Sequence, residues 1–141
     1  KRWGGKLILK GIQDVEDARL AVESGADALI VSNHGGRQLD GAESSINALP
    51  GIVDAVGQQI EVHMDGGIRS GQDVLKAVAL GAKGVYIGRP FVYGLGAMGE
   101  AGVTKALEII HKEMDVTMAL CGKTRVEQID KSILLPGTYP T

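Results

Sequence analysis

The stretch "IEVHMDGGIRSGQDVLKAVALGAKGVYIGR", residues 60–89, contains two apolar runs separated by an amphipathic segment. We predict strands at 60–67 and 84–89, the second of which is apolar at successive positions from Val85 to Ile87, as is typical of a parallel sheet. Between them, Ser70 and Asp73 have the spacing of a helix capping box, and Gly81 follows as a C-terminal stop. We therefore predict a strand–helix–strand unit with parallel strands.

The rest of the chain repeats this order. Two more strands are predicted, at 6–11 and 28–33, and three more helices, at 14–27, 44–57 and 99–122. We expect the helix at 44–57 to break near Pro50, because proline removes a helical hydrogen bond. A capped turn at 124–130 precedes a tail from Leu134 that is expected to be loose. Residues 21–33 resemble residues 77–89, which indicates a repeat of two strand–helix units.

The resulting βαβαβαβα order fits either a doubly wound α/β sheet or a (β/α)₈ barrel. We favour the barrel, because every predicted strand ends in a polar or glycine cluster, where barrel active sites lie. A barrel needs eight strands and about 250 residues. The chain, 1–141, is therefore predicted to be half a barrel without a second domain. It would be a fragment, one chain of a two-chain protein, or one of two copies that complete each other.

Composition excludes several classes of function. The net charge of −2 argues against a nucleic-acid partner, and no apolar run reaches the about 20 residues of a membrane helix. The single cysteine, Cys121, excludes an internal disulfide framework, and no cysteine–histidine spacing supports a zinc site. We expect a cytoplasmic protein.

The ends of the last two predicted strands have the residues of an anion site. In "DGGIR", 65–69, Gly66 and Gly67 allow backbone N–H groups to approach an anion, and the helix from about Ser70 directs its positive end nearby. Two arginines that can each hold a phosphate follow the strands, Arg69 and, after Gly88, Arg89. Barrel phosphate sites follow strands seven and eight. We therefore assign the chain as strands 5–8, the C-terminal half. The alternative is that the glycines only shape turns and the arginines are solvated.

The segment "VSNHGGRQLDG", 31–41, places His34 and Arg37 after another strand. Arg37 can clamp a carboxylate, and His34 can act as a general base worth about 10²–10⁴-fold in rate. The alternative is a structural histidine on a loop. Lys10 and Asp65, at neighbouring strand ends, are expected to face a ligand, or else to form a salt bridge within the rim. His63, in mid-strand beside Glu61, is predicted to pack in the core or barrel floor.

Together, "LILKG", "VSNHGGRQLDG", "MDGGIRSGQDVLKAVALGAKGVYIGRP" and "GEAGV" resemble one family, the FMN-dependent α-hydroxy acid oxidases and dehydrogenases. Its members include glycolate oxidase, L-lactate oxidase and dehydrogenase, mandelate dehydrogenase and the flavin domain of flavocytochrome b2. The resemblance covers about residues 6–133. Several FMN barrels share the glycine–arginine part, whereas "SNHGGRQ" separates this family from them.

The resemblance implies a role for each candidate residue. His34 is the active-site base, Arg37 binds the substrate carboxylate, and Lys10 lies near the N1–C2 carbonyl edge of the flavin. The remaining FMN-binding residues are Ser32 beside the flavin, Asp65 at the ribityl chain, and Gly66, Gly67, Arg69, Gly88 and Arg89 around the phosphate. The implied reaction oxidises an L-2-hydroxy acid to a 2-oxo acid with two electrons passing to FMN. His34 would take either the hydroxyl proton or the α-carbon proton.

The resemblance also implies partners. The tyrosines that contact substrate, the aspartate that orients the histidine and a second arginine belong to the first half of the family barrel. A complementary N-terminal half-barrel is therefore expected, in the same or a separate chain, and a homotetramer by family resemblance. Peripheral membrane association or a peroxisomal location remains open for the parent protein. Alternative functions are another FMN-phosphate-binding barrel enzyme, or an incomplete half-barrel that at most binds phosphate.

Overall fold

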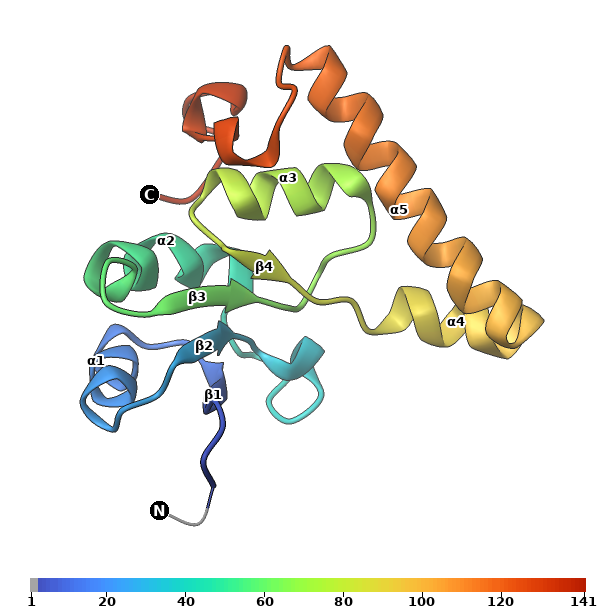
Figure 1. The fold of residues 1–141 in the computed structure, drawn as a ribbon. Coiled ribbons are helices and arrows are strands. Elements are labelled where there is room, and N and C mark those ends of the chain that lie inside the picture. The colour runs from blue at the N-terminus through green and yellow to red at the C-terminus, as the bar shows by residue number, and fades with distance from the viewer. Residues whose placement is uncertain (1–2) are drawn as a thin grey trace.

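The computed structural model describes residues 3–141 and contains a single parallel sheet (Figure 1). Its strands are β1 (Ile8–Ile12), β2 (Ala28–Val31), β3 (Glu61–Met64) and β4 (Gly84–Val85), in the spatial order β1-β2-β3-β4. Consecutive parallel neighbours need a crossover between them, and a helix supplies each one. The predicted alternation of strands and helices is confirmed.

Three helices lie against one face of this sheet: α1 (Val15–Glu23), α2 (Ser45–Val56) and α3 (Gly71–Ala79). Side chains cap the starts of α1 and α3 but not that of α2, and the capping box predicted for α3 is confirmed. The Asp14 carboxylate accepts a hydrogen bond from the Glu16 amide at 2.8 Å, and Ser70 with Asp73 forms a full capping box. The main hydrophobic core lies between this helical layer and the alternate strand residues Leu29, Val31, Val62 and Met64, all fully buried.

The opposite face of the sheet is not covered by a helix among the described residues. Ile8 on β1 is 47% exposed, and Tyr86, just beyond β4, is 42% exposed. Apolar runs predicted strands buried on both faces, but within residues 3–141 only one face has a helical layer. The physical reason is that side chains alternate along a strand, so each run contributes one set to the helical side and one to this open face.

Two further helices, α4 (Arg89–Met98) and α5 (Glu100–Leu120), form a hairpin beside the sheet (Figure 1). Glycines permit their close contact: a Cβ atom on Gly102 would lie 1.9 Å from the Gly94 carbonyl oxygen. Only α5 was predicted. The strand predicted at 84–89 ends at Val85, because the chain turns into α4 at Arg89. None of the described helices is long and apolar enough to cross a membrane.

Two other local predictions were wrong. Helix α2 continues through Pro50, which is fully buried, so packing of its ring offsets the lost hydrogen bond. The tail after Leu134 was expected to be loose, but Leu134 and Tyr139 pack against the core. The predicted turn at 124–130 is a 3₁₀ helix at Val126–Gln128, and a second one follows at Lys131–Ile133.

Candidate functional site

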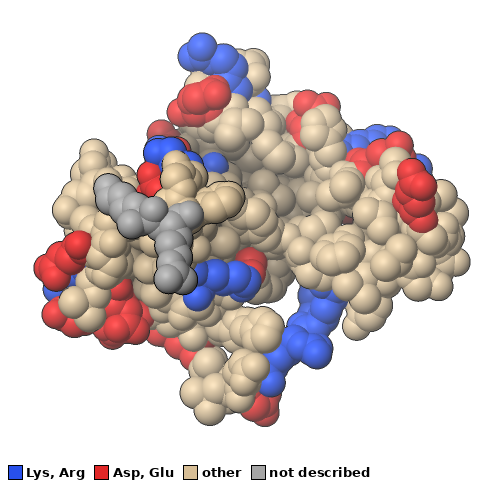
Figure 2. Space-filling model, turned by 60° about the horizontal axis from the view of Figure 1, so that its bottom comes forward, with Lys and Arg blue, Asp and Glu red and all other residues tan. Residues whose placement is uncertain are grey.

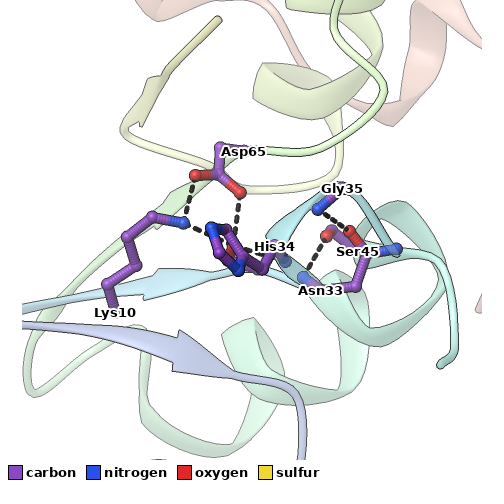
Figure 3. A network of polar contacts seen from close by, with 7 residues as sticks. Lys10, Asn33, His34, Gly35, Ser45 and Asp65 are labelled. Atoms are coloured by element: carbon purple, nitrogen blue, oxygen red, sulfur yellow. Dashed lines mark hydrogen bonds and ion pairs between the residues drawn. The ribbon is translucent and has the colours of Figure 1, made fainter. Parts of the chain in front are cut away.

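A polar network joins the C-terminal ends of the first three strands (Figure 3). The Lys10 ammonium donates to the Ser32 hydroxyl at 2.6 Å and forms an ion pair with the Asp65 carboxylate. The Ser32 hydroxyl donates to Asp65 and accepts from the His34 amide at 3.1 Å. Ser32 is 3% exposed, and this arrangement uses its one proton and both its lone pairs. The network therefore fixes three strand ends relative to one another.

The salt bridge expected as the alternative for Lys10 and Asp65 is present, and the expectation that they face a ligand stays a prediction. Their side chains form the salt bridge within the rim, and both also line the cavity described below. A parallel register makes the pairing possible: Lys10 lies opposite Ile30 of β2, and Ile30 lies opposite His63 of β3. Ser32 and Asp65 each follow two residues later, so they project from the same face of the sheet as Lys10.

The loop after β2 holds His34 in an unusual backbone conformation. His34 has a φ of 55°, and Gly35 and Gly36 follow with φ of 66° and 71°. Among the described residues 3–141, His34 is the one residue other than glycine that has a positive φ. Asn33 supports the turn in two ways. Its side-chain oxygen accepts a hydrogen bond from the Gly35 backbone amide at 2.8 Å, and its own backbone amide donates to the Ser45 hydroxyl at 3.0 Å. Strain of this kind is typical of functional sites and persists only where neighbours impose it.

The predicted glycine cradle follows β3. Gly66 and Gly67 both have φ of 89°, a conformation that disfavours any side chain. A Cβ atom on Gly66 would lie 2.9 Å from both the Asn33 side-chain oxygen and the Ser45 hydroxyl. A Cβ atom on Gly67 or Gly88 would meet no atom within 4 Å, so the space beside these two residues is open to a ligand.

The helix that offers free N–H groups is not the predicted one. At the start of α3, the Arg69 and Ser70 amides both donate to the Asp73 carboxylate at 3.0 Å, and the Gly71 amide donates to Glu113 at 2.9 Å. The N-terminus of α3 is therefore already satisfied by protein groups. Helix α4 begins at Arg89 after Gly88 without a side-chain cap, so the N-terminal end of α4 remains available to an anion.

These strand ends surround a cavity of about 540 Å³, within the size range of small-molecule sites. Every predicted site residue except the buried Ser32 lines it: Lys10, His34, Arg37, Asp65, Gly66, Gly67, Arg69, Gly88 and Arg89. The Arg89 guanidinium also donates to the Gly35 carbonyl at 2.9 Å, which ties the end of β4 to the histidine loop. On the face seen in Figure 2, the surface is hollowed between the sheet and the α4–α5 hairpin, with basic side chains beside the hollow.

Sequence reasoning missed the cavity residues contributed by α4 and the segment before it. Tyr86, Ile87, Pro90, Val92 and Tyr93 also line the cavity. The signal was present, because a proline just inside a helix start, here Pro90 after Gly88, is a common beginning of a helix. For His63, the structure contradicts a place in the core, whereas a place on the barrel floor stays a prediction. His63 lies on the open face of the sheet, where its ring stacks on Tyr86.

The fold and this cavity define an α/β protein with a candidate ligand site at the C-terminal ends of parallel strands. The sequence matches the model of the family described as FMN-dependent dehydrogenase over residues 1–136. The chain belongs to this family.

Several relatives agree with that assignment. The chain is 58% identical over 133 residues to an L-lactate dehydrogenase of Caulobacter sp. (strain K31), a match that covers 94% of this chain and 35% of that protein. It is 56% identical to an L-lactate dehydrogenase of Pseudomonas syringae pv. syringae, with the same coverage. The chain thus spans about a third of the length of these curated relatives.

Solved structures give the same answer. Mandelate oxidase with 3,3-difluoro-2-hydroxy-3-phenylpropionic acid matches with a TM-score of 0.88 at 50% identity, covering 92% of this chain and 39% of that one. Mandelate oxidase with benzoyl-formic acid matches with a TM-score of 0.86 at 52% identity, covering 89% and 37%. At such identities the likeness extends beyond the fold to the family.

Proposed function

We propose that this chain supplies strands 5–8 of a (β/α)₈ barrel that oxidises an L-2-hydroxy acid to the 2-oxo acid. The parallel order β1-β2-β3-β4 with helices on one face is the arrangement expected of half such a barrel. The partly exposed opposite face would become the barrel interior. A complementary half-barrel, in the same or a separate chain, would cover it and close the two sheet edges.

FMN is the proposed cofactor, and the residues present fit it. The open space beside Gly67 and Gly88, the guanidinium groups of Arg69 and Arg89 and the uncapped start of α4 suit a phosphate dianion. Asp65 can accept hydrogen bonds from ribityl hydroxyls, and the Lys10 ammonium can stabilise negative charge that develops on a reduced flavin. When bound, FMN would supply the acceptor for two electrons.

His34 and Arg37 would handle the substrate. Both side chains are exposed and line the cavity, three residues apart on the loop after β2. The Arg37 guanidinium would bind the carboxylate in a bidentate manner and so orient the α-carbon. The imidazole of His34 would then accept a proton from the substrate, either from the hydroxyl or from the α-carbon. Gly35 and Gly36 keep the loop free of side chains between these two groups.

The observation that carries this proposal is the meeting of two kinds of site in one cavity. The histidine–arginine pair and the glycine–arginine phosphate site come from strand ends about 30 to 55 residues apart, yet they line the same space. A phosphate-binding barrel of another kind would not need the first pair. L-Lactate is the first substrate to test, because both relatives described above are L-lactate dehydrogenases.

The experiment is an anaerobic absorbance measurement on the complete barrel that contains this chain. We expect bound flavin whose visible absorption band bleaches on addition of L-lactate, glycolate or L-mandelate, and not with D-lactate as the control. Bound flavin that no 2-hydroxy acid bleaches would favour another FMN barrel enzyme. A colourless complete barrel would contradict the cofactor assignment. The homotetramer and the cytoplasmic location predicted from the sequence stay predictions.

A further inference from the structure

Three side chains on the open face of the sheet form a hydrogen-bonded row that the proposed reaction does not use. On β3, the His63 Nε2 atom lies 3.2 Å from the Glu61 carboxylate. Across to the segment after β4, the His63 Nδ1 atom lies 3.3 Å from the Tyr86 hydroxyl. The two rings are stacked, with centroids 5.8 Å apart and planes inclined by 27°. We call Glu61, His63 and Tyr86 the β3–β4 clamp.

The chemistry of the three groups gives the row a direction. An ionised Glu61 only accepts hydrogen bonds, so the Nε2 atom of His63 must carry the proton in that contact. In the neutral imidazole, Nδ1 is then an acceptor, and the Tyr86 hydroxyl donates to it. The His63 side chain is 17% exposed, whereas that of Glu61 is 68% exposed, so the ring is partly buried and its bond to Glu61 is open to water. Glu61 thus fixes the tautomer that can hold Tyr86.

The backbone of β4 is adapted to this arrangement. Gly84 lies opposite His63 in the parallel register. A Cβ atom on Gly84 would lie 2.7 Å from the His63 Nδ1 atom and 3.0 Å from its Cε1 atom. Any other residue at position 84 would push the imidazole away from Tyr86. The glycine therefore makes room for the imidazole to lie over β4.

The position of β4 matters because this strand is short. It has two residues, and beyond its ladder the Tyr86 amide donates to the Met64 carbonyl at 3.0 Å. Two residues later, Gly88 and Arg89 begin α4 and line the cavity, which Tyr86 lines as well. The clamp is thus attached to the chain just before the proposed phosphate site.

We propose that Glu61, His63 and Tyr86 are positioning residues that hold the end of β4 and thereby set Gly88 and Arg89 for the phosphate of the cofactor. This inference rests on the proposed function. The clamp holds the backbone that leads to Gly88 and Arg89, so it should affect recognition of the phosphate end of FMN more than recognition of the ring system.

The test compares FMN with riboflavin, which lacks the phosphate, on the complete barrel freed of cofactor. Dissociation constants come from flavin fluorescence during titration. Tyr86→Phe, which removes only the hydroxyl, should weaken FMN binding about three- to tenfold, the range for one well-placed hydrogen bond, and should weaken riboflavin binding less. His63→Phe, which keeps a stacking ring, should do the same. Tyr139→Phe, which removes a phenol outside the clamp and the cavity, is the control.

A double variant tests whether the two residues act as one unit. Because both act through the same bond, His63→Phe combined with Tyr86→Phe should lose no more FMN affinity than either single variant. Equal losses of affinity for FMN and riboflavin would show a merely structural role and overturn the inference. An unchanged ratio of the riboflavin to the FMN dissociation constant in Tyr86→Phe would overturn it as well. If the unmutated barrel bound both flavins equally, the phosphate site of the proposed function would fail as well. If the His63→Phe variant does not fold, the Tyr86→Phe variant alone tests the inference, because phenylalanine keeps the aromatic ring of Tyr86.

Discussion

The pair Gly66 and Gly67 offers a matched test of how the cavity loop is built. Both residues have φ of 89°, so alanine at either position pays the same conformational cost of about 1–2 kcal/mol. Only at Gly66 does the new methyl group meet protein, at 2.9 Å from the Asn33 and Ser45 oxygens. Those oxygens accept the Gly35 and Asn33 amides. Two neutral hydrogen bonds at about 0.5–1.5 kcal/mol each add about 1–3 kcal/mol to the cost of Gly66→Ala.

Urea unfolding of the cofactor-free complete barrel measures this difference, since the free energy of unfolding falls linearly with urea. The cofactor is left out because binding to the folded state would itself add stability. Gly66→Ala should have a lower free energy of unfolding than Gly67→Ala by the cost of the two hydrogen bonds, about 1–3 kcal/mol. Equal stabilities, or a greater loss in Gly67→Ala, would refute the argument from the Asn33 contact.

The same two substitutions should also distinguish the His34 loop from the part of the cavity proposed to bind FMN. Gly66→Ala displaces Asn33, which supports the His34 loop, so it should lower the rate of 2-hydroxy acid oxidation at saturating FMN. Gly67→Ala places a methyl group into open space at the cavity, so it should chiefly weaken FMN binding. Steady-state kinetics at saturating FMN and a flavin titration distinguish these effects. Weaker FMN binding in both variants with an unchanged rate would contradict the assignment of the loops.

Three other changes give independent predictions. His34→Gln should abolish flavin reduction by L-lactate while FMN stays bound, measured by anaerobic stopped-flow absorbance; near-normal reduction would disprove the role of the base. Arg37→Met should raise KM more than it lowers kcat, because the carboxylate loses a bidentate partner, with Arg37→Lys expected to lie between. The hydrogen bond from Lys6, together with that from the Leu7 amide, lowers the pKa of Asp27. The ionised Asp27 therefore stabilises the folded protein above the ordinary carboxyl pKa, and this contribution is lost as pH falls through the lowered pKa. Asp27→Asn should therefore flatten the acid side of thermal stability against pH, and an unchanged acid side would refute this.

The sequence was informative wherever structure depends on neighbouring residues. The cap at Asp14, the capping box of Ser70 and Asp73, and the strand ends could all be predicted, because each depends on residues a few positions apart. The prediction failed for Pro50, where burial of the ring outweighed a local rule. It failed for α4 because glycines at 94 and 96 lower the helix propensity of that segment, and packing against α5 compensates.

The composition of the candidate site was also predictable, but its contacts were not. Glycine and arginine clusters at strand ends identified the residues that line the cavity. The bond from the Gly71 amide to Glu113 depends on a contact with α5, more than 40 residues away, whereas the bonds to Asp73 belong to the local capping box. Spacing along the chain gives no access to such a contact. The start of α4, which has no side-chain cap, is therefore the helix end that we propose for the anion site.

The Lys10–Ser32–Asp65 network shows how this chain can hold a charged site before any ligand arrives. Lys10 and Asp65 neutralise each other at the rim, and the ammonium also donates to Ser32. An ammonium group has three donors, so one remains for a ligand, and a carboxylate has lone pairs beyond those used here. A cofactor can therefore add hydrogen bonds to both residues without breaking the ion pair. The pair is 45% and 18% exposed, so covering it with a ligand would strengthen its attraction by excluding water. Ligand binding and the alignment of three strand ends would then reinforce each other.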